Sequence, residues 1–454
     1  MTHMKIKRMK LNKMKSIGIV AGMLLCLACG WSRAEVPVQS WTLGNGARVL
    51  FVENHTLPIL DVSVDFDAGE RRDPAGKSGT AALANAMLAR GIKQAEMPAG
   101  SEPAMSEAQI SDAFADIAAQ RGVRVDNDRS GVTLRTLVSH RDVAIPLLGR
   151  LLAQPAFPEE LLARDKARTI SDLKESLTTP EEIADRAFTH LLYGRHPYAA
   201  QPTEASLHAI SRADLIAFHA TYFVANHAVV AIIGDLTREQ ADRVAQQLTD
   251  RLPQGVALPD LPPVLVAQGR EQRLPHPASQ AHILIGMPAY AFHDPDHYAL
   301  SVGNYILGGG GFASRLTREV REKRGLTYGV YSFFSPRAQP GPFQIGLQTQ
   351  KQQAEQALQV VRDTLAAFLR DGPTKAELRG AKDNLIGGFA LRLDSNRKIL
   401  ENIAAIGFYG LPLDYLDRWP ERIKSVTAAE VKAAFSRKIR LDQLSTVVVG
   451  GMTQ

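Results

Sequence analysis

The sequence predicts an α+β protein made of two similar halves, each a mostly antiparallel sheet backed by helices. Three observations lead to this fold class. An Asn-Gly turn between two alternating apolar segments near residue 45 is typical of a β-hairpin. A helix followed by an apolar strand that ends in glycine occurs late in each half. A proline-rich segment, 252–263, separates the two halves.

The first half begins with strands and continues with helices. Segments 38–43 and 48–52 flank the turn Gly44-Asn45-Gly46, and 60–66 alternates as a third strand. Segment 78–90 has helical periodicity, with Ser78 as its expected cap and Gly91 as its stop. Its successor, 94–106, is rich in Pro, Ala, Glu and Ser and is expected to be a loop. Further helices are expected over 107–120, 141–152, 159–177 and 212–222, followed by a buried strand over 229–233.

The internal repeat sets the expected domain organisation. Residues 211–218 (SRADLIAF) precede the strand VVAIIG, and residues 427–435 (TAAEVKAAF) precede the strand TVVVG. Each is a capped helix that leads to an apolar strand. The proline and glycine residues between the halves favour an extended connection. We therefore expect an N-terminal domain over 35–251, a linker over 252–263 and a C-terminal domain over 264–454.

The first 34 residues are typical of a secretory signal peptide. A basic stretch precedes an apolar run, 17–29, and Ser32-Arg33-Ala34 places small residues at the positions that precede cleavage after Ala34. An uncleaved anchor and a lipid anchor at Cys29 are the alternatives, although the residues before Cys29 fit a lipidation signal poorly. The run is short for a membrane span, and no second long apolar run follows. Cys26 and Cys29 are the only cysteines, so disulfides and thiolate metal sites are excluded from the rest of the chain.

Charge argues against a nucleic-acid partner. The chain has 53 basic and 47 acidic residues, but seven basic residues and no acidic ones lie in 1–34. The remainder is close to neutral and lacks the positive field that binds phosphate backbones.

Several motifs that could carry chemistry do not meet their own requirements. Gly76-Lys77-Ser78 resembles the end of a phosphate loop. Six residues separate Gly76 from the preceding glycine, Gly69, whereas a phosphate loop needs four. The glycine run 308–311 has no lysine in register. The histidines form no H-E-x-x-H or H-x-x-E-H motif, so no self-contained zinc site is visible.

The segment 305–334 (YILGGGGFASRLTREVREKRGLTYGVYSFF) holds the most informative pair of residues. Ser314 can cap a helix that Gly325 ends, and a strand is expected over 326–334. This brings Arg321, in the last helical turn, close to Tyr328. A guanidinium and a phenol at such a junction can both donate hydrogen bonds to a peptide carbonyl or an oxyanion. The alternative is a solvated charge and a packing residue.

The motif LGGGGFASRL followed by EVREKRGLTY closely resembles the C-terminal signature of the pitrilysin-like (M16) zinc peptidases. Other matching pieces are LGNG (43–46), DPAGKSG (73–79), YGRHPY (193–198) and YLDRWPERIKSVT (415–427), so the resemblance covers residues 35–454. It implies two α+β roll domains that close as a clamshell over an extended peptide. It also implies that Arg321 and Tyr328 bind the substrate backbone near the scissile bond.

The chain departs from this family at the metal site. Catalytic members carry H-x-x-E-H on the first helix, where two histidines hold zinc and the glutamate is the general base. The aligned residues are Ala82, Asn85 and Ala86. The later glutamate ligand aligns best with Asp172, with Asp165 seven residues before it. One carboxylate cannot hold zinc against water, so no metal or catalytic residue is expected in this chain.

The resemblance implies a non-catalytic, substrate-binding subunit of an exported, periplasmic M16 zinc peptidase that acts on peptides. Its partner would be a second M16 chain with H-x-x-E-H, which holds the zinc in a heterodimer. The chain alone is expected to be inactive. One alternative is a structural or peptide-binding M16-like protein without a peptidase partner, and another is an enzyme with an unrecognised site. The peptide, the bond cleaved and the partner's identity stay open.

Overall fold

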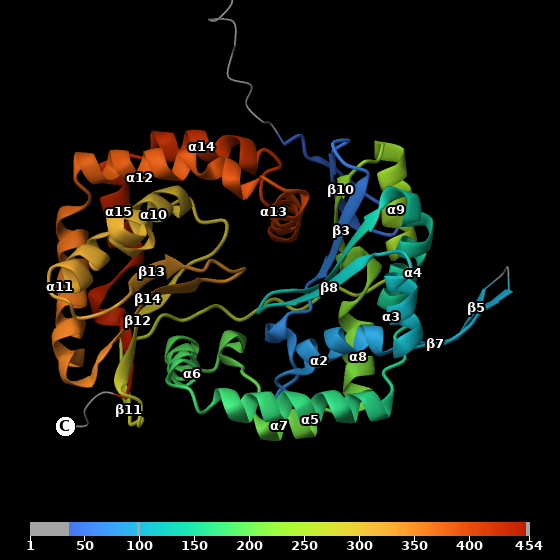
Figure 1. Cartoon of the computed structure of the whole chain (residues 1–454), viewed down its shortest axis with the longest axis horizontal. Helices are drawn as coiled ribbons and strands as arrows, with labels where there is room; N and C mark the ends of the chain where they lie inside the picture. The colour runs from blue at the N-terminus through green and yellow to red at the C-terminus, as the bar shows by residue number, and fades with distance from the viewer. Residues whose placement is uncertain (1–35, 98–99, 451–454) are drawn as a thin grey trace, which may run out of the picture. The chain divides into compact units, whose positions relative to one another are not determined.

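The computed structural model describes residues 36–97 and 100–450, and residues from Val38 onward belong to one compact unit. The predicted signal peptide, its cleavage site after Ala34 and the alternative anchor at Cys29 lie outside the described residues. Within those described ranges, no helix combines the length and hydropathy needed to cross a membrane. The chain is an α+β protein, as predicted (Figure 1).

The first half contains a six-stranded sheet in the order β1-β2-β10-β3-β9-β8. Only the β2–β10 pair is parallel. The predicted hairpin joins β1 to β2, with Leu43 N donating to Ala47 O at 2.9 Å and Gly46 at a φ of 88°. The strands are β1 Gln39–Thr42, β2 Arg48–Glu53, β3 Ile59–Phe66, β8 Gln120–Val125, β9 Ser130–Leu137 and β10 Val229–Gly234.

The second half repeats this topology in a five-stranded sheet, β11-β15-β12-β14-β13. In both sheets the last strand of the half lies between two earlier strands. It is antiparallel to one of them (β3 or β12) and parallel to the other (β2 or β11). The sequence repeat is therefore a structural repeat. These strands are β11 Glu271–Leu274, β12 Gln280–Tyr290, β13 Val330–Phe334, β14 Gly341–Gln350 and β15 Ser445–Val449.

Helices cover the sheets. In the first half they are α2 Thr80–Met87, α3 Glu107–Ala115, α4 Arg141–Ala153, α5 Glu159–Ser176, α6 Pro180–Tyr193, α7 Glu204–Ala209, α8 Arg212–Tyr222 and α9 Arg238–Thr249. In the second half they are α10 His297–Asn304, α11 Ala354–Asp371, α12 Lys375–Gly387, α13 Asn396–Tyr409, α14 Tyr415–Ser425 and α15 Ala428–Lys438. The repeated helices α8 and α15 both begin with a capping box, which explains why their starts were visible in the sequence.

Each half contributes one helix to the other half's sheet. Helix α6 packs on β12 and β15, where Phe188 joins an apolar cluster with Leu284 and Val447. Helix α13 packs on β2, β3 and β10 of the first sheet (Figure 1). There Arg48 Nη1 donates to Gly407 O at 3.1 Å. The two halves are thus joined by exchanged helices, a feature that no local pattern predicts.

A buried carboxylate also joins the halves. Asp128, 1% exposed, pairs with Arg71 and accepts a hydrogen bond from Tyr198 Oη at 2.6 Å, both within the first half. From the second half it accepts bonds from the backbone N of Ala338 at 2.8 Å and from Tyr409 Oη at 2.9 Å. Every donor that a buried carboxylate needs is therefore supplied by four separate segments.

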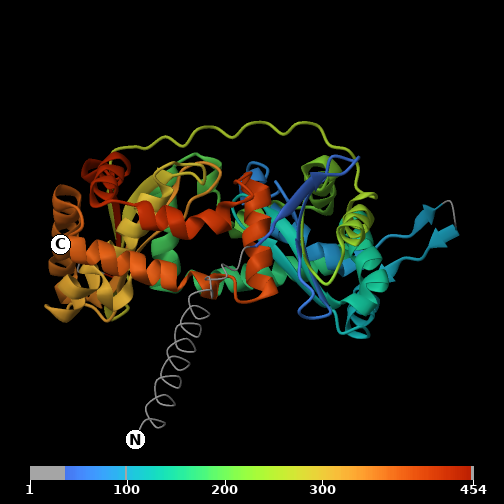
Figure 2. The same ribbon diagram turned by 90° about the horizontal axis from the view of Figure 1, so that it is seen from above.

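The connection between the halves has no helix or strand from residue 251 to residue 270. Figure 2 shows it as an extended run along one side of the compact unit. It is held by side chains of the first half, with Arg72 donating to Pro259 O at 2.9 Å and His196 Nε2 lying 2.9 Å from Pro262 O. The sequence predicted an extended connection here, and the segment has no helix or strand. The bounds of the two domains stay a prediction.

Some expected elements are wrong in detail. The strand expected over 326–334 is only Val330–Phe334, because Thr327 Oγ1 ties the preceding residues to Gln348 O at 2.6 Å. The loop expected over 94–106 contains three short strands. β5 Ala95–Met97 pairs with β6 Gly100–Glu102, and β7 Met105–Ser106 pairs with β4 Gly91–Ile92, which precedes the loop. The helix expected over 107–120 ends at Ala115, and Gln120 begins a strand.

Candidate functional site

Helix α2 carries Ala82, Asn85 and Ala86, the positions that the sequence aligns with the H-x-x-E-H motif of catalytic M16 members. It is capped by Asp73 and not, as expected, by Ser78. The Asp73 carboxylate accepts hydrogen bonds from Gly79 N at 2.6 Å and Ala81 N at 2.7 Å. These bonds satisfy backbone donors of the first helical turn. The helix is therefore well formed, although Ala82 and Ala86 present no ligand atom on its half-buried side.

Asn85 is fully buried and holds two strands of the first sheet. Its Nδ2 donates to Arg124 O at 2.8 Å and to Gly131 O at 3.1 Å. These carbonyls belong to β8 and β9. The side chain thus uses its amide hydrogens, which a glutamate general base lacks. The residue at this position ties α2 to the sheet and has no proton-accepting carboxylate.

Asp172 and Asp165 occupy different environments. Asp172 is exposed on α5, and its side chain makes no hydrogen bond or ion pair with another described residue. Asp165 is 2% exposed and pairs with Arg90 Nε at 2.7 Å and Arg164 Nε at 3.0 Å. Arg90 lies four residues beyond Ala86, on the same side of this segment. In residues 36–97 and 100–450, no three His, Cys, Asp or Glu side chains are placed to hold a metal ion.

Arg321 and Tyr328 are in contact, at the junction that the sequence predicted. Arg321 lies in a π-helical turn, Thr317–Glu322, and Gly325 reverses the chain with a φ of 62°. The Arg321 guanidinium carbon is 4.8 Å from the ring centres of both Tyr328 and Phe312. This cation–π geometry leaves the edge of the guanidinium free to donate. Its side chain has no ion pair or hydrogen bond among the described residues, and Tyr328 is 86% exposed.

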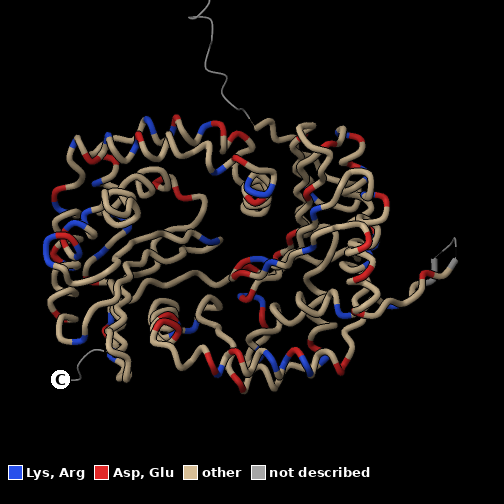
Figure 3. Tube along the Cα trace, in the orientation of Figure 1, with Lys and Arg blue, Asp and Glu red and all other residues tan. Residues whose placement is uncertain are grey.

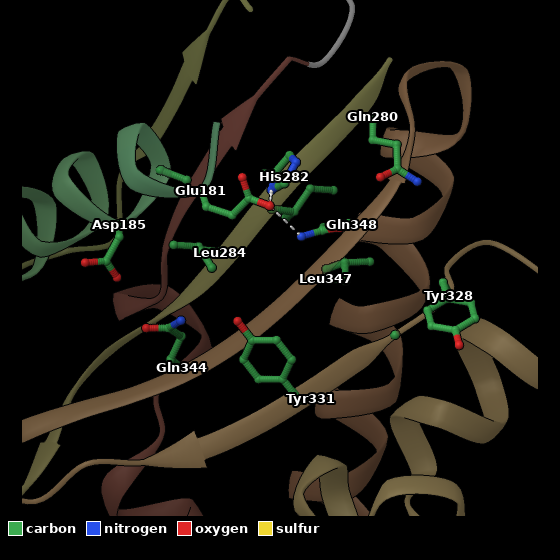
Figure 4. A pocket seen from close by; sticks show the side chains of 13 residues that line it. Glu181, Asp185, Gln280, His282, Leu284, Tyr328, Tyr331, Gln344, Leu347 and Gln348 are labelled. Atoms are coloured by element: carbon green, nitrogen blue, oxygen red, sulfur yellow. Dashed lines mark hydrogen bonds and ion pairs between the residues drawn. The ribbon is translucent and has the colours of Figure 1, made fainter. Parts of the chain in front are cut away.

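A pocket of about 370 Å³ adjoins Tyr328 (Figure 4). Its wall is shared by α6 of the first half and the strands of the second sheet. Glu181, from α6, accepts a hydrogen bond from Gln348 Nε2 at 3.0 Å and lies 3.5 Å from His282 Nδ1. Burial lowers the pKa of His282 and raises the pKa of Tyr331, so both groups are neutral near pH 7.

The sequence did not identify these pocket residues. Glu181 and Tyr331 are separated by much of the chain and meet only because α6 crosses to the second sheet. Chemically, the pocket and the Arg321–Tyr328 pair offer hydrogen-bond donors and a recess for a side chain, which suits an extended peptide. Figure 3 shows basic and acidic residues interspersed along the chain in both halves.

Comparisons with known proteins identify the family of the chain. A sequence profile described as the peptidase M16 inactive domain matches residues 209–385. A crystal structure of a peptidase M16 inactive domain from Pseudomonas fluorescens is 36% identical, with a TM-score of 0.86 over 92% of this chain and 98% of that chain. The chain is thus an M16-type α+β protein. It belongs to the peptidase M16 family.

Two further relatives differ in how they are described. The uncharacterized zinc protease YmxG of Bacillus subtilis is 24% identical over 80% of this chain and 87% of the relative. The non-peptidase homolog YmxG of Helicobacter pylori is 26% identical over 88% of this chain and 91% of the relative.

Proposed function

We propose that this chain is a non-catalytic, substrate-binding subunit of a zinc peptidase of the M16 family. The observation that carries the proposal is the contrast between two sites. Helix α2 has Ala82, Asn85 and Ala86 where ligands and a general base are needed. Arg321, which is half-buried, and Tyr328, which is exposed, in contrast form a pair of hydrogen-bond donors that no other described side chain uses.

The partner is a second M16 chain that carries H-x-x-E-H and holds the zinc. In this arrangement a peptide lies between the subunits, and the chemistry of hydrolysis belongs to the partner. The guanidinium of Arg321 donates charge-assisted hydrogen bonds to a peptide carbonyl, and the phenol of Tyr328 adds a neutral donor. The leader predicted over 1–34 supports a periplasmic location for the complex. The description of one relative as a non-peptidase homolog supports the absence of activity in this chain alone.

The test is a peptide-cleavage assay of the complex rebuilt from this chain and its catalytic partner, encoded beside it or isolated with it. Arg321→Ala is expected to lower kcat/KM by about 10- to 100-fold, because one charged hydrogen bond contributes about 1.5–3 kcal/mol. Tyr328→Phe is expected to have a smaller effect, since it removes a neutral donor and keeps the ring.

Arg324→Ala is the matched control, because Arg324 pairs with Glu319 on the same turn and points its charge there. It should leave kcat/KM unchanged. Size-exclusion chromatography must show that each variant still forms the complex. Undiminished cleavage by an intact Arg321→Ala complex would refute the substrate-binding role. A chain that forms no complex with any H-x-x-E-H relative would instead favour the structural or peptide-binding alternative.

A further inference from the structure

A second pocket, of about 470 Å³, lies in the second half of the chain and is lined by residues between Tyr290 and Trp419. It is formed by α10, α12, α14 and β13, which Figure 1 shows grouped together. None of its lining residues belongs to the Arg321–Tyr328 site or to the pocket beside it. The proposed function makes no use of this pocket.

The structural repeat relates the position of this pocket to helix α2 of the first half. In each half, a helix follows one of the corresponding strands: α2 follows β3, and α10 follows β12. In the first half, α2 packs against α5, α8 and β8, and Asn85 on α2 is hydrogen-bonded to the sheet. In the second half, α10 lines an open pocket. The pocket therefore lies beside the helix that is the counterpart of α2.

One wall of the pocket is an ordered row of uncharged polar groups. His297, on α10, lies between two phenols, with Nδ1 3.1 Å from Tyr290 Oη and Nε2 3.0 Å from Tyr415 Oη. Burial lowers the pKa of His297 to about 4, so the ring is neutral at pH 7. A neutral imidazole donates through one nitrogen and accepts through the other, so both phenols are oriented.

The pocket holds one charge that lacks a counter-ion. Arg392 is the only Lys, Arg, Asp or Glu among the described residues that line it. Its guanidinium carbon lies 5.1 Å from the ring centre of Trp419, and that ring stacks on Phe389 at 4.7 Å. The side chain of Arg392 makes no ion pair or hydrogen bond within the described residues. Stacking fixes the plane of a guanidinium and leaves its N–H groups available to a carboxylate.

We infer that this pocket binds a small organic carboxylate that carries an apolar group. The carboxylate pairs with Arg392, and the apolar group lies against Phe333, Phe334 and Leu385, which also line the pocket. Two features favour a carboxylate with a ring or chain over a bare anion: the single cation and the aromatic walls. The volume is within the range of pockets that hold small molecules.

The test uses isothermal titration calorimetry of the purified chain with N-acetyl-L-phenylalanine, N-acetyl-L-phenylalaninamide and inorganic phosphate. The acid is expected to bind in a saturable manner, and the amide at least about tenfold more weakly, because it lacks the charged acceptor. Phosphate is expected to bind weakly, since it has no apolar group. Binding of phosphate as tightly as the acid would overturn the requirement for an apolar group.

Arg392→Gln should reduce the affinity for the acid by about tenfold and remove its advantage over the amide. Arg397→Gln is the matched control, because Arg397 is exposed on α13, where it pairs with Glu401 and lies outside the pocket. Arg392 is exposed, so its replacement should leave the melting temperature unchanged. The inference is wrong if the acid does not bind, if the amide binds equally well, or if Arg392→Gln binds the acid as the unaltered chain does.

Discussion

At position 85, the difference between an amide and a carboxylate decides what the residue can do. Asn85 donates two hydrogen bonds to carbonyl oxygens of neighbouring strands, in a position with no exposed surface. A carboxylate there would face both oxygens without a donor and would lose its hydration. Restoring the family's general base would therefore destabilise this part of the sheet.

Asn85→Asp tests this statement with almost no change in shape. It removes both donors and buries a charge, so the free energy of unfolding should fall by about 2–4 kcal/mol. The measurement is urea-induced unfolding at pH 7. Asn402→Asp is the control, because Asn402 donates one bond to Lys398 O on an exposed face of α13. Its effect should stay within about 0.5 kcal/mol. Equal stability of the two variants would show that the Asn85 bonds contribute little.

A buried histidine gives the stability a defined pH dependence. His219 Nε2 lies 2.7 Å from Leu152 O, and burial lowers the pKa of His219 to about 4. An unfolded histidine has a pKa near 6.5, so the unfolded state binds more protons between these values. The contribution of His219 is therefore present above about pH 6.5 and is lost as the pH falls towards 4.

His219→Gln should keep a donor for Leu152 O and remove this titration. We expect its melting temperature to fall less steeply than that of the unaltered chain between pH 6.5 and pH 4.5. Thermal unfolding followed by circular dichroism measures both slopes. Parallel slopes would show that other groups cause the acid sensitivity.

At the scale of elements, the sequence revealed what neighbouring residues determine. The hairpin at Asn45, the capped helices α8 and α15 and the contact of Arg321 with Tyr328 each depend on fewer than about fifteen consecutive residues, and each was found. The cap of α2 was assigned wrongly, because Asp73 reaches it from outside the helix. The exchange of α6 and α13 was missed, since its partners are distant in sequence and only the folded sheet faces select them.

The packing of α13 on the first sheet depends on a glycine. A Cβ at Gly407 would overlap Leu50 Cδ1 and Val229 Cγ1. Gly407→Ala should therefore lower the free energy of unfolding by about 1–3 kcal/mol, as overpacking does. Gly380→Ala is the control, because Gly380 is exposed on α12 with nothing within 4 Å of a Cβ. It should stabilise the chain by about 0.5–1 kcal/mol through helix propensity. Urea unfolding measures both changes in the free energy of unfolding. If Gly407→Ala stabilises the chain as Gly380→Ala does, the close packing at Gly407 is contradicted.

At the scale of the whole compact unit, Asp128 joins the two halves through polar contacts, as the exchanged helices α6 and α13 do through packing. Its carboxylate binds Arg71 and Tyr198 of the first half and Ala338 and Tyr409 of the second. Since the site is buried, removal of the Asp128 charge leaves the Arg71 guanidinium with Asp67 as its one remaining ion-pair partner among the described residues.

Asp128→Asn should lower the free energy of unfolding by about 3–5 kcal/mol. It should also speed proteolysis within 251–270, because this extended segment is held by neighbours of Asp128. Asp442→Asn is the control, since Asp442 is exposed beside Arg440 and should change neither quantity. Unfolding in urea and timed protease digestion provide the two measurements. Unchanged digestion with reduced stability would confine the role of Asp128 to the first half.

The exchange of α6 and α13 has a consequence for synthesis of the chain. The first sheet has all its strands once residue 234 has left the ribosome, yet the helix that covers one of its faces ends only at residue 409. Until then, an apolar surface of the nascent chain stays uncovered. Such a surface is a site for chaperones, and stable folding is delayed until residue 409 has been synthesised. For the export proposed above, this delay is an advantage, because the chain stays unfolded for longer before it crosses a membrane.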